Sequence, residues 1–147
     1  MKGYSLLRSD SGPKPGQILV YGGVINRRDL SNVPHEVRLS STPRQRGKAG
    51  VYVSATVINP EHFDMTDEAF AELEDTYTAG IMNALGEGQI LVCGEGGDIE
   101  IGDYIVTSSR PGVGMRQDDD VLRSYAIAEA REAVNWIEEG SDESDLV

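Results

Sequence analysis

The 147-residue chain contains a single cysteine, Cys93, so no disulfide can form within it. Cys93 ends the apolar run of residues 90–93, and we expect a buried thiol that packs as a small hydrophobic side chain. The sequence also lacks an apolar run of about 18 residues, the length that a membrane-spanning helix needs. Neither a disulfide-stabilised scaffold nor a transmembrane helix is therefore expected in these residues.

Large apolar side chains are scarce as well. The chain has one Trp and two Phe, and hydrophobic residues make up only 39% of it, so we expect a modest core built mainly from Val, Ile, Leu, Ala and Tyr. The length suits one full-sized domain. Only three Lys accompany ten Arg and 25 acidic residues. A saline habitat would favour such a Lys-poor acidic surface, although ordinary acidic proteins share the bias.

The charges are distributed unevenly. Residues 1–50 carry nine basic and three acidic side chains, whereas residues 51–147 carry 22 acidic side chains and four Arg. The basic segment therefore covers its own acidic part, docks on a neighbouring subunit, or binds an external polyanion such as nucleic acid. Tyr21 is its only central aromatic residue, so a platform for stacking bases is unsupported. We favour self-association through complementary charges.

The pattern of residues 86–125 indicates β-structure. Short apolar runs alternate there with breaks that contain Gly, Asp or Pro, which is typical of tightly turned strands. Upstream, residues 50–58 predict the clearest strand because β-branched and aromatic residues dominate it. Residues 36–40 alternate between polar and apolar side chains and predict another strand.

The first fifty residues are otherwise irregular. Residues 9–16 hold two Pro and two Gly and cannot continue a helix or a central strand. Residues 18–21 and 24–25 resemble two short strands around a turn at Gly22 and Gly23. We predict that residues 1–50 form a basic, partly extended arm with short strands.

Residues 65–74 predict a short helix. Thr66 is a natural N-cap, acidic residues follow in the first turn, and Phe70 and Leu73 share one face. Residues 76–84 either extend this helix or form the next strand, and Gly80 weakens the helical alternative.

Residues 125–139 are ambiguous. Their Ala- and Glu-rich composition, closed by Gly140 as a C-cap, favours a helix, whereas the alternation of the first six favours a strand. Residues 141–147 contain three acidic side chains, and we predict a disordered acidic tail. The whole pattern predicts a mainly β fold. It is a compact β-sandwich or barrel-like module over residues 51–140, with one or two short helices and the N-terminal arm.

No set of side chains predicts a metal or phosphate site. Asp118, Asp119 and Asp120 are adjacent and lack EF-hand spacing, which favours a solvated acidic turn over a calcium loop. Residues 94–97 superficially resemble a phosphate loop, but the Lys and Ser/Thr that complete one are missing. We expect no cofactor and no metal.

Catalytic groups are not predicted either. Four acids at Gly-rich turns could pair as general acid and base, but they are typical of solvent-facing loops: Glu87, Asp98, Glu100 and Asp103. The isolated His35 and His62 make no metal set with Cys93. Ser108 has no base nearby in sequence. We therefore predict that the protein is not an enzyme.

Four short motifs occur in a characteristic order: NALGEG at residues 83–88, GDIEIGDYI at 97–105, PGVGMRQ at 111–117 and SYAIA at 124–128. This order resembles a β-rich module of tailed-virus structural proteins, particularly the distal parts of tail fibres and related surface proteins. The resemblance covers residues 80–136 and implies successive strands and turns, with a strand over residues 125–130. Many members carry a self-cleaving intramolecular chaperone beside the module. We recognise no such segment here, which favours a small virion component such as a decoration protein, a fibre-tip subunit or an adaptor.

The resemblance and the charge pattern together predict a virion structural protein that is assembled in the host cytoplasm. We expect a homo-oligomer on the particle surface, as a capsid decoration or tail-fibre component, with a trimer favoured and capsid or tail subunits as further partners. Four arginines are predicted to dock on acidic neighbours: Arg27, Arg28, Arg44 and Arg46. The alternatives are a fibre-associated hydrolase or autoprotease, and a nucleic-acid-binding virion protein that uses the basic segment.

Overall fold

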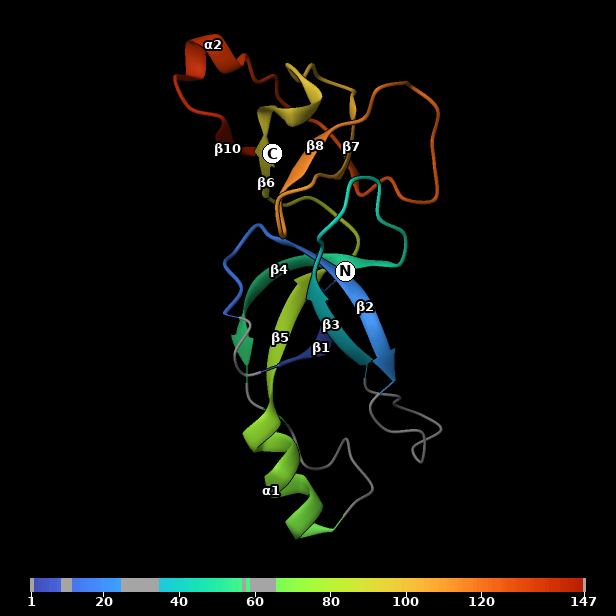
Figure 1. The fold of residues 1–147 in the computed structure, drawn as a ribbon, viewed down its shortest axis with the longest axis vertical. Coiled ribbons are helices and arrows are strands. Elements are labelled where there is room, and N and C mark those ends of the chain that lie inside the picture. The colour runs from blue at the N-terminus through green and yellow to red at the C-terminus, as the bar shows by residue number, and fades with distance from the viewer. Residues whose placement is uncertain (1, 9–11, 25–34, 57, 59–65, 147) are drawn as a thin grey trace.

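The computed structural model describes residues 2–8, 12–24, 35–56, 58 and 66–146. In these residues a closed five-stranded barrel is followed by a second five-stranded sheet (Figure 1). The barrel consists of β1 (Lys2–Arg8), β2 (Ile18–Val24), β3 (His35–Leu39), β4 (Lys48–Thr56) and β5 (Tyr77–Asn83), with α1 (Asp67–Thr76) before β5. The mainly β, barrel-like fold with short helices is confirmed.

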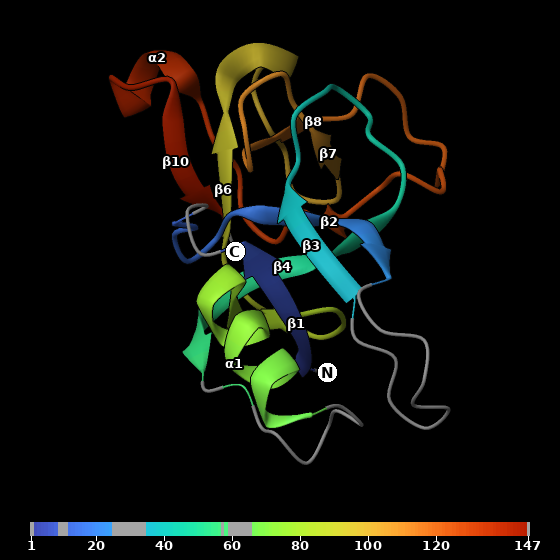
Figure 2. The same ribbon diagram turned by 60° about the horizontal axis from the view of Figure 1, so that its bottom comes forward.

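The second sheet has the strand order β10-β6-β8-β7-β9. Its strands are β6 (Ile90–Cys93), β7 (Tyr104–Thr107), β8 (Gly114–Arg116), β9 (Ala128–Glu129) and β10 (Glu143–Leu146), and α2 (Trp136–Glu139) precedes β10. A short 3-10 helix, η2 (Gly94–Gly96), follows β6. Figures 1 and 2 show this sheet against one end of the barrel and α1 at the other end.

The strands within residues 1–50 belong to the barrel. β1 pairs with β5 along its whole length, from Lys2 opposite Asn83 to Arg8 opposite Tyr77, and it also pairs in parallel with β3. Leu6 and Leu7 are at most 1% exposed. The predicted short strands are present, but residues 2–8 form a barrel strand instead of part of the predicted partly extended arm. Pairing with a strand that lies some seventy positions away and burial of both leucines hold the segment in the barrel.

The two short strands predicted around Gly22 and Gly23 are one strand in the described residues. β2 continues through both glycines, and the register of its pairing with β3 shifts between Tyr21 and Gly23. Gly23 has a φ of 148°, which a residue with a side chain rarely adopts. The glycine pair therefore makes a bulge instead of a turn.

The predicted helix is confirmed as α1. The Thr66 hydroxyl accepts a hydrogen bond from the Ala69 amide at 3.2 Å, and Leu73 is buried in a cluster with Leu6. The ambiguous residues 76–84 form β5. Gly80 is needed in this strand because a Cβ there would lie 2.6 Å from the Leu7 side chain.

The C-terminal region contains both a strand and a helix. β9 covers two residues, α2 covers four, and Gly140 ends α2 in the left-handed conformation with φ 69°. The prediction of a disordered tail is wrong over its described residues. β10 pairs antiparallel with β6, from Glu143 opposite Cys93 to Leu146 opposite Ile90. The free backbone groups of β6 at the sheet edge give this polar segment hydrogen-bond partners.

The barrel and the second sheet share a core. Ile18 of β2 is fully buried in a cluster with six residues of the second half: Ile90, Val92, Ile99, Ile105, Ala130 and Val134. The Ile18 amide donates to the Gly112 carbonyl at 2.7 Å, and the Gly112 amide donates to the Ser40 carbonyl at 2.9 Å. The two parts are therefore joined by both side-chain packing and backbone hydrogen bonds.

Candidate functional site

Two of the four predicted partner-binding arginines can be placed. Arg44 and Arg46 lie in the loop of residues 41–47 between β3 and β4, which we call the basic loop, and both are exposed. Arg27 and Arg28 lie outside the described residues. The structure therefore brings two of these arginines together on one short loop.

The basic loop is fixed to β7. The Arg44 amide donates to the Thr107 carbonyl at 3.0 Å, the Gln45 amide donates to the Thr107 hydroxyl at 2.7 Å, and that hydroxyl donates to the Thr42 carbonyl at 2.7 Å. Arg44 has a φ of 53°, a strained value for a residue with a side chain. The hydrogen bonds to Thr107, which is fully buried, hold this conformation. The loop is thus preorganised.

Among the described residues, the Arg44 side chain has a weak ion-pair partner. Its Nη2 lies 3.8 Å from the Asp118 carboxylate, and the two side chains are 44% and 72% exposed. An ion pair with that exposure adds little stability, because water and salt screen it. The guanidinium group of Arg44 can therefore exchange this contact for one with another molecule.

Acidic segments follow the basic one along the chain. Residues 57–89 carry eight acidic and no basic side chains, and residues 90–147 carry fourteen acidic side chains and four Arg. The first group includes the five acids of α1, at the end of the barrel opposite the second sheet (Figure 1). The barrel strands from the basic segment therefore lie between two acidic elements.

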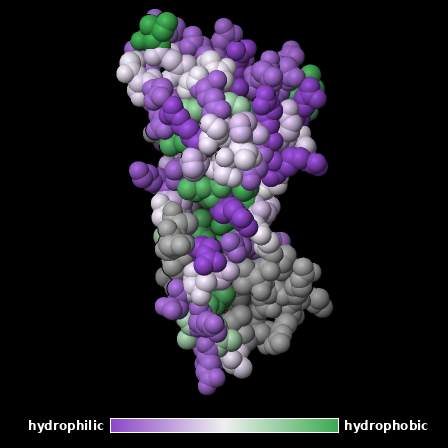
Figure 3. Space-filling model, in the orientation of Figure 1, coloured by the Kyte–Doolittle hydropathy of each residue, from purple (hydrophilic) through white to green (hydrophobic). Residues whose placement is uncertain are grey.

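A cleft of about 760 Å³ lies between the barrel and the second sheet. Its apolar lining comes from β4, from the loop of residues 84–89 and from the second sheet: Ala49, Val51, Val53, Leu85, Ile105 and Ile127. Figure 3 shows apolar side chains at the molecular surface where the two parts meet. No histidine, cysteine or serine lines the cleft among the described residues. It is suited to binding by shape and apolar contact.

Two of the four acids considered for catalysis, Asp98 and Asp103, have structural contacts. Asp98 accepts a hydrogen bond from the Trp136 amide at 3.0 Å, and Asp103 accepts one from the Glu100 amide at 2.8 Å. Asp103 also forms an ion pair with Arg116 at 3.3 Å. These carboxylates close local turns and join loops of the second sheet.

The acidic turn of residues 118–120 is also organised locally. The Asp119 carboxylate accepts hydrogen bonds from Arg123, from the Val121 amide and from Gln117, and these bonds lower the pKa of Asp119, Arg123 having the largest effect. Within the described part of the chain, no three His, Cys, Asp or Glu residues are placed to hold a metal ion.

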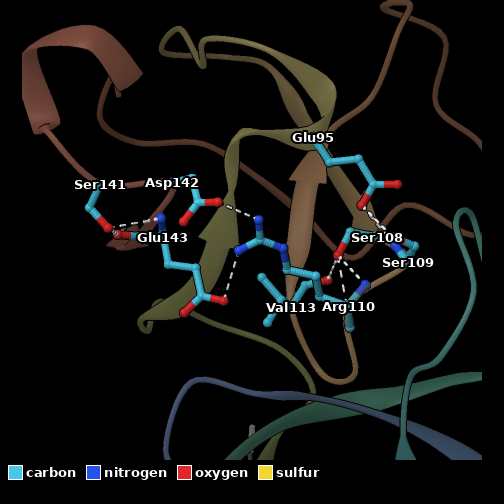
Figure 4. Close-up of polar contacts among 8 residues, drawn as sticks. All are labelled: Glu95, Ser108, Ser109, Arg110, Val113, Ser141, Asp142 and Glu143. Carbon is cyan, nitrogen blue, oxygen red and sulfur yellow. Dashed lines mark hydrogen bonds and ion pairs between the residues drawn. The ribbon is translucent and has the colours of Figure 1, made fainter.

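The serines near β7 stabilise turns (Figure 4). The buried Ser108 hydroxyl donates to the Val113 carbonyl at 2.7 Å and accepts from the Arg110 amide at 3.2 Å. Ser109 donates from its amide and its hydroxyl to Glu95 at 3.0 and 2.9 Å. The Ser108 hydroxyl thus closes a turn. Its hydrogen bonds within the described residues are to backbone groups, not to a basic side chain.

Arg110 binds the start of the C-terminal strand. Its guanidinium group donates to Asp142 at 2.5 Å and to Glu143 at 3.0 Å, as Figure 4 shows. We call this arrangement the Arg110 clamp. Bonding to Arg110 lowers the pKa of Asp142, and bonding to Asp142 and then Glu143 raises the pKa of Arg110. No sequence pattern predicts the clamp, because Arg110 and Asp142 lie thirty-two positions apart and the acidic tail is expected to be disordered.

The clamp predicts that acid loosens β10. The folded-state pKa of Asp142 lies below its ordinary value of 3.8, so its contribution is present above that value and is lost as the pH falls through the folded pKa. We expect amide protection of residues 143–146 to decrease between pH 7 and pH 2, before that of β7 and β8, in hydrogen exchange. In an Asp142→Asn variant, protection is expected to be lower already at pH 7 and to change less with acid. Equal protection of β10 at both pH values would contradict the prediction.

No protein-family model, curated protein or solved structure matches this chain. Among the described residues, none of the helices has the length and apolar character needed to cross a membrane.

Proposed function

We propose that this protein is a virion structural protein of a tailed virus and that it assembles as a homo-oligomer on the particle surface, as a capsid decoration or tail-fibre component. The order of the four motifs in residues 83–128 supports the class of protein. The observation that carries the assembly mechanism is the basic loop, which presents Arg44 and Arg46 from a rigid backbone.

Complementary charge explains how copies associate. With a net charge of −12, the molecules repel one another on average, so a contact needs a basic surface on one side. The basic loop supplies it, and the acidic surface of a neighbouring copy, or of a capsid or tail subunit, supplies the opposite sign. Because the loop is already ordered, little conformational entropy is lost when it docks. Exposed charge pairs of this kind also steer the encounter.

Reversing the charge of the basic loop is expected to weaken assembly. We expect Arg44→Glu combined with Arg46→Glu to lower the solution mass, measured by light scattering, below that of the unchanged protein, because the charge-mediated contacts are lost. The mass of the unchanged protein should also fall as salt rises, because the screening length shortens from about 10 Å at 0.1 M to about 3 Å at 1 M.

The control keeps the charge and changes only the head group. Arg44→Lys combined with Arg46→Lys is expected to assemble like the unchanged protein, since both exposed positions stay positive. If the Glu variant, folded by circular dichroism, keeps the mass of the unchanged protein, the basic loop has no part in assembly.

A further inference from the structure

Leu85 is an exposed apolar residue on the lining of an apolar cleft. Its side chain is 65% exposed, whereas Ile105, which also lines the cleft, is fully buried. An exposed apolar side chain beside an apolar hollow offers a binding partner both a projecting group and a concave apolar surface. The protruding group and the hollow lie on the same part of the molecule.

The Leu85 loop, residues 84–89, has a defined shape. The Asn83 side-chain amide donates to the Glu87 carbonyl at 3.1 Å across the loop, and Gly86 has a φ of 105°. Gly88 lies close to the same side chain, since a Cβ there would be 2.6 Å from the Asn83 Nδ2. Leu85 is therefore presented by an ordered backbone, which lowers the entropy cost of burying it in a partner.

The charges that line the cleft fit a second copy of this chain. Lys48 and Arg131 are basic, Glu87 and Glu129 are acidic, and these are the charged residues of the lining. This surface is thus electrically balanced in a protein of net charge −12, so two copies meet there with less repulsion than an average contact brings. A surface that carries both signs can also pair with itself, as a two-fold symmetric contact requires.

We infer that two copies pair through this cleft, with Leu85 of each copy inserted into the cleft of the other. The contact is two-fold because the protruding residue and the hollow share one face, so each copy offers both to its partner. Leu85, Val51 and Val53 supply apolar contact area in this lining, and the four charged residues belong to the same lining. The inference rests on the proposed self-association but does not depend on the basic loop.

The test compares two exposed leucines. Leu85 and Leu122 are 65% and 71% exposed, and only Leu85 lines the cleft. In light scattering, we expect Leu85→Glu to lower the solution mass about two-fold, because a two-fold contact is lost, and Leu122→Glu to leave it unchanged. If Leu85→Glu stays assembled, the cleft contact is excluded while self-association stands. If the unchanged protein is a single chain at every salt concentration, both the contact and the proposed self-association fall.

A second measurement leaves Leu85 in place. Ala84 also lines the cleft and is exposed. In Ala84→Cys, reaction with an uncharged maleimide is expected to slow at high protein concentration, because pairing covers residue 84. In Leu122→Cys the rate should be the same in dilute and concentrated samples. The native Cys93 is fully buried and adds little to either rate. Equal rates for Ala84→Cys at both concentrations would overturn the inference.

Discussion

Replacing Ile18 with alanine is expected to lower the free energy of unfolding by about 2–5 kcal/mol, the usual range for removing a large aliphatic side chain from a core. Ile18 is 0% exposed and comes from a barrel strand, yet it packs among the core residues of the second sheet. Its loss leaves a cavity where the two parts of the fold meet. Urea unfolding followed by circular dichroism measures the change.

Ile137 provides the matched control. It is also an isoleucine but is 91% exposed, so Ile137→Ala should change the free energy of unfolding by no more than about 0.5 kcal/mol. Because Ile18 joins the barrel to the second sheet, we expect both parts to unfold at a lower urea concentration in the Ile18→Ala variant than in the unchanged protein. An effect of Ile18→Ala as small as that of Ile137→Ala would show that the shared core does not join them.

Gly112→Ala is expected to cost a similar amount for a different reason. Gly112 has a φ of 72°, and a Cβ there would lie 2.9 Å from both the Gln17 Cβ and the Leu39 side chain. The left-handed backbone costs about 1–2 kcal/mol for a residue with a side chain. Overpacking adds about 1–3 kcal/mol. Because the Gly112 amide and carbonyl also bond to Ser40 and Ile18, any shift that relieves the clash strains the junction of barrel and sheet.

Gly102→Ala separates the two contributions. Gly102 has a φ of 94°, but nothing lies within 4 Å of the position of an added Cβ. We expect the free energy of unfolding of this variant to fall only by the backbone contribution, about 1–2 kcal/mol. The same urea unfolding experiment measures it. Equal losses for the two glycine variants would mean that the neighbours of Gly112 move aside without cost.

Local patterns predicted several elements well. The alternation of residues 36–40 matches β3, the β-branched run of residues 50–58 matches most of β4, and the Thr66 cap starts α1. These features depend on backbone propensity and on hydrogen bonds between residues three or four apart, so a single segment contains the information. Gly140 as the end of α2 belongs to the same group.

Long-range pairing explains what was missed. The bulge at Gly22 and Gly23 appears only in the pairing of β2 with β3, whose register shifts between Tyr21 and Gly23. The acidic tail became β10 because β6 offers it an open edge and Arg110, thirty-two positions before Asp142, binds it there. Each of these partners lies outside the segment whose structure it determines, so the sequence of that segment alone does not predict the pairing.

Part of the candidate site could be predicted from the sequence, and part could not. Charge counts alone pointed to Arg44 and Arg46, because an excess of one sign in a segment needs no structure to be seen. Leu85 was not predicted, since its importance depends on the cleft that β4 and the region around β9 form together. By itself the sequence determined the mainly β class, the helix cap and the segregation of charge, which are local or compositional properties. Only the tertiary structure decided the barrel closure, the added C-terminal strand and the apolar cleft, because each needs residues distant in sequence to meet.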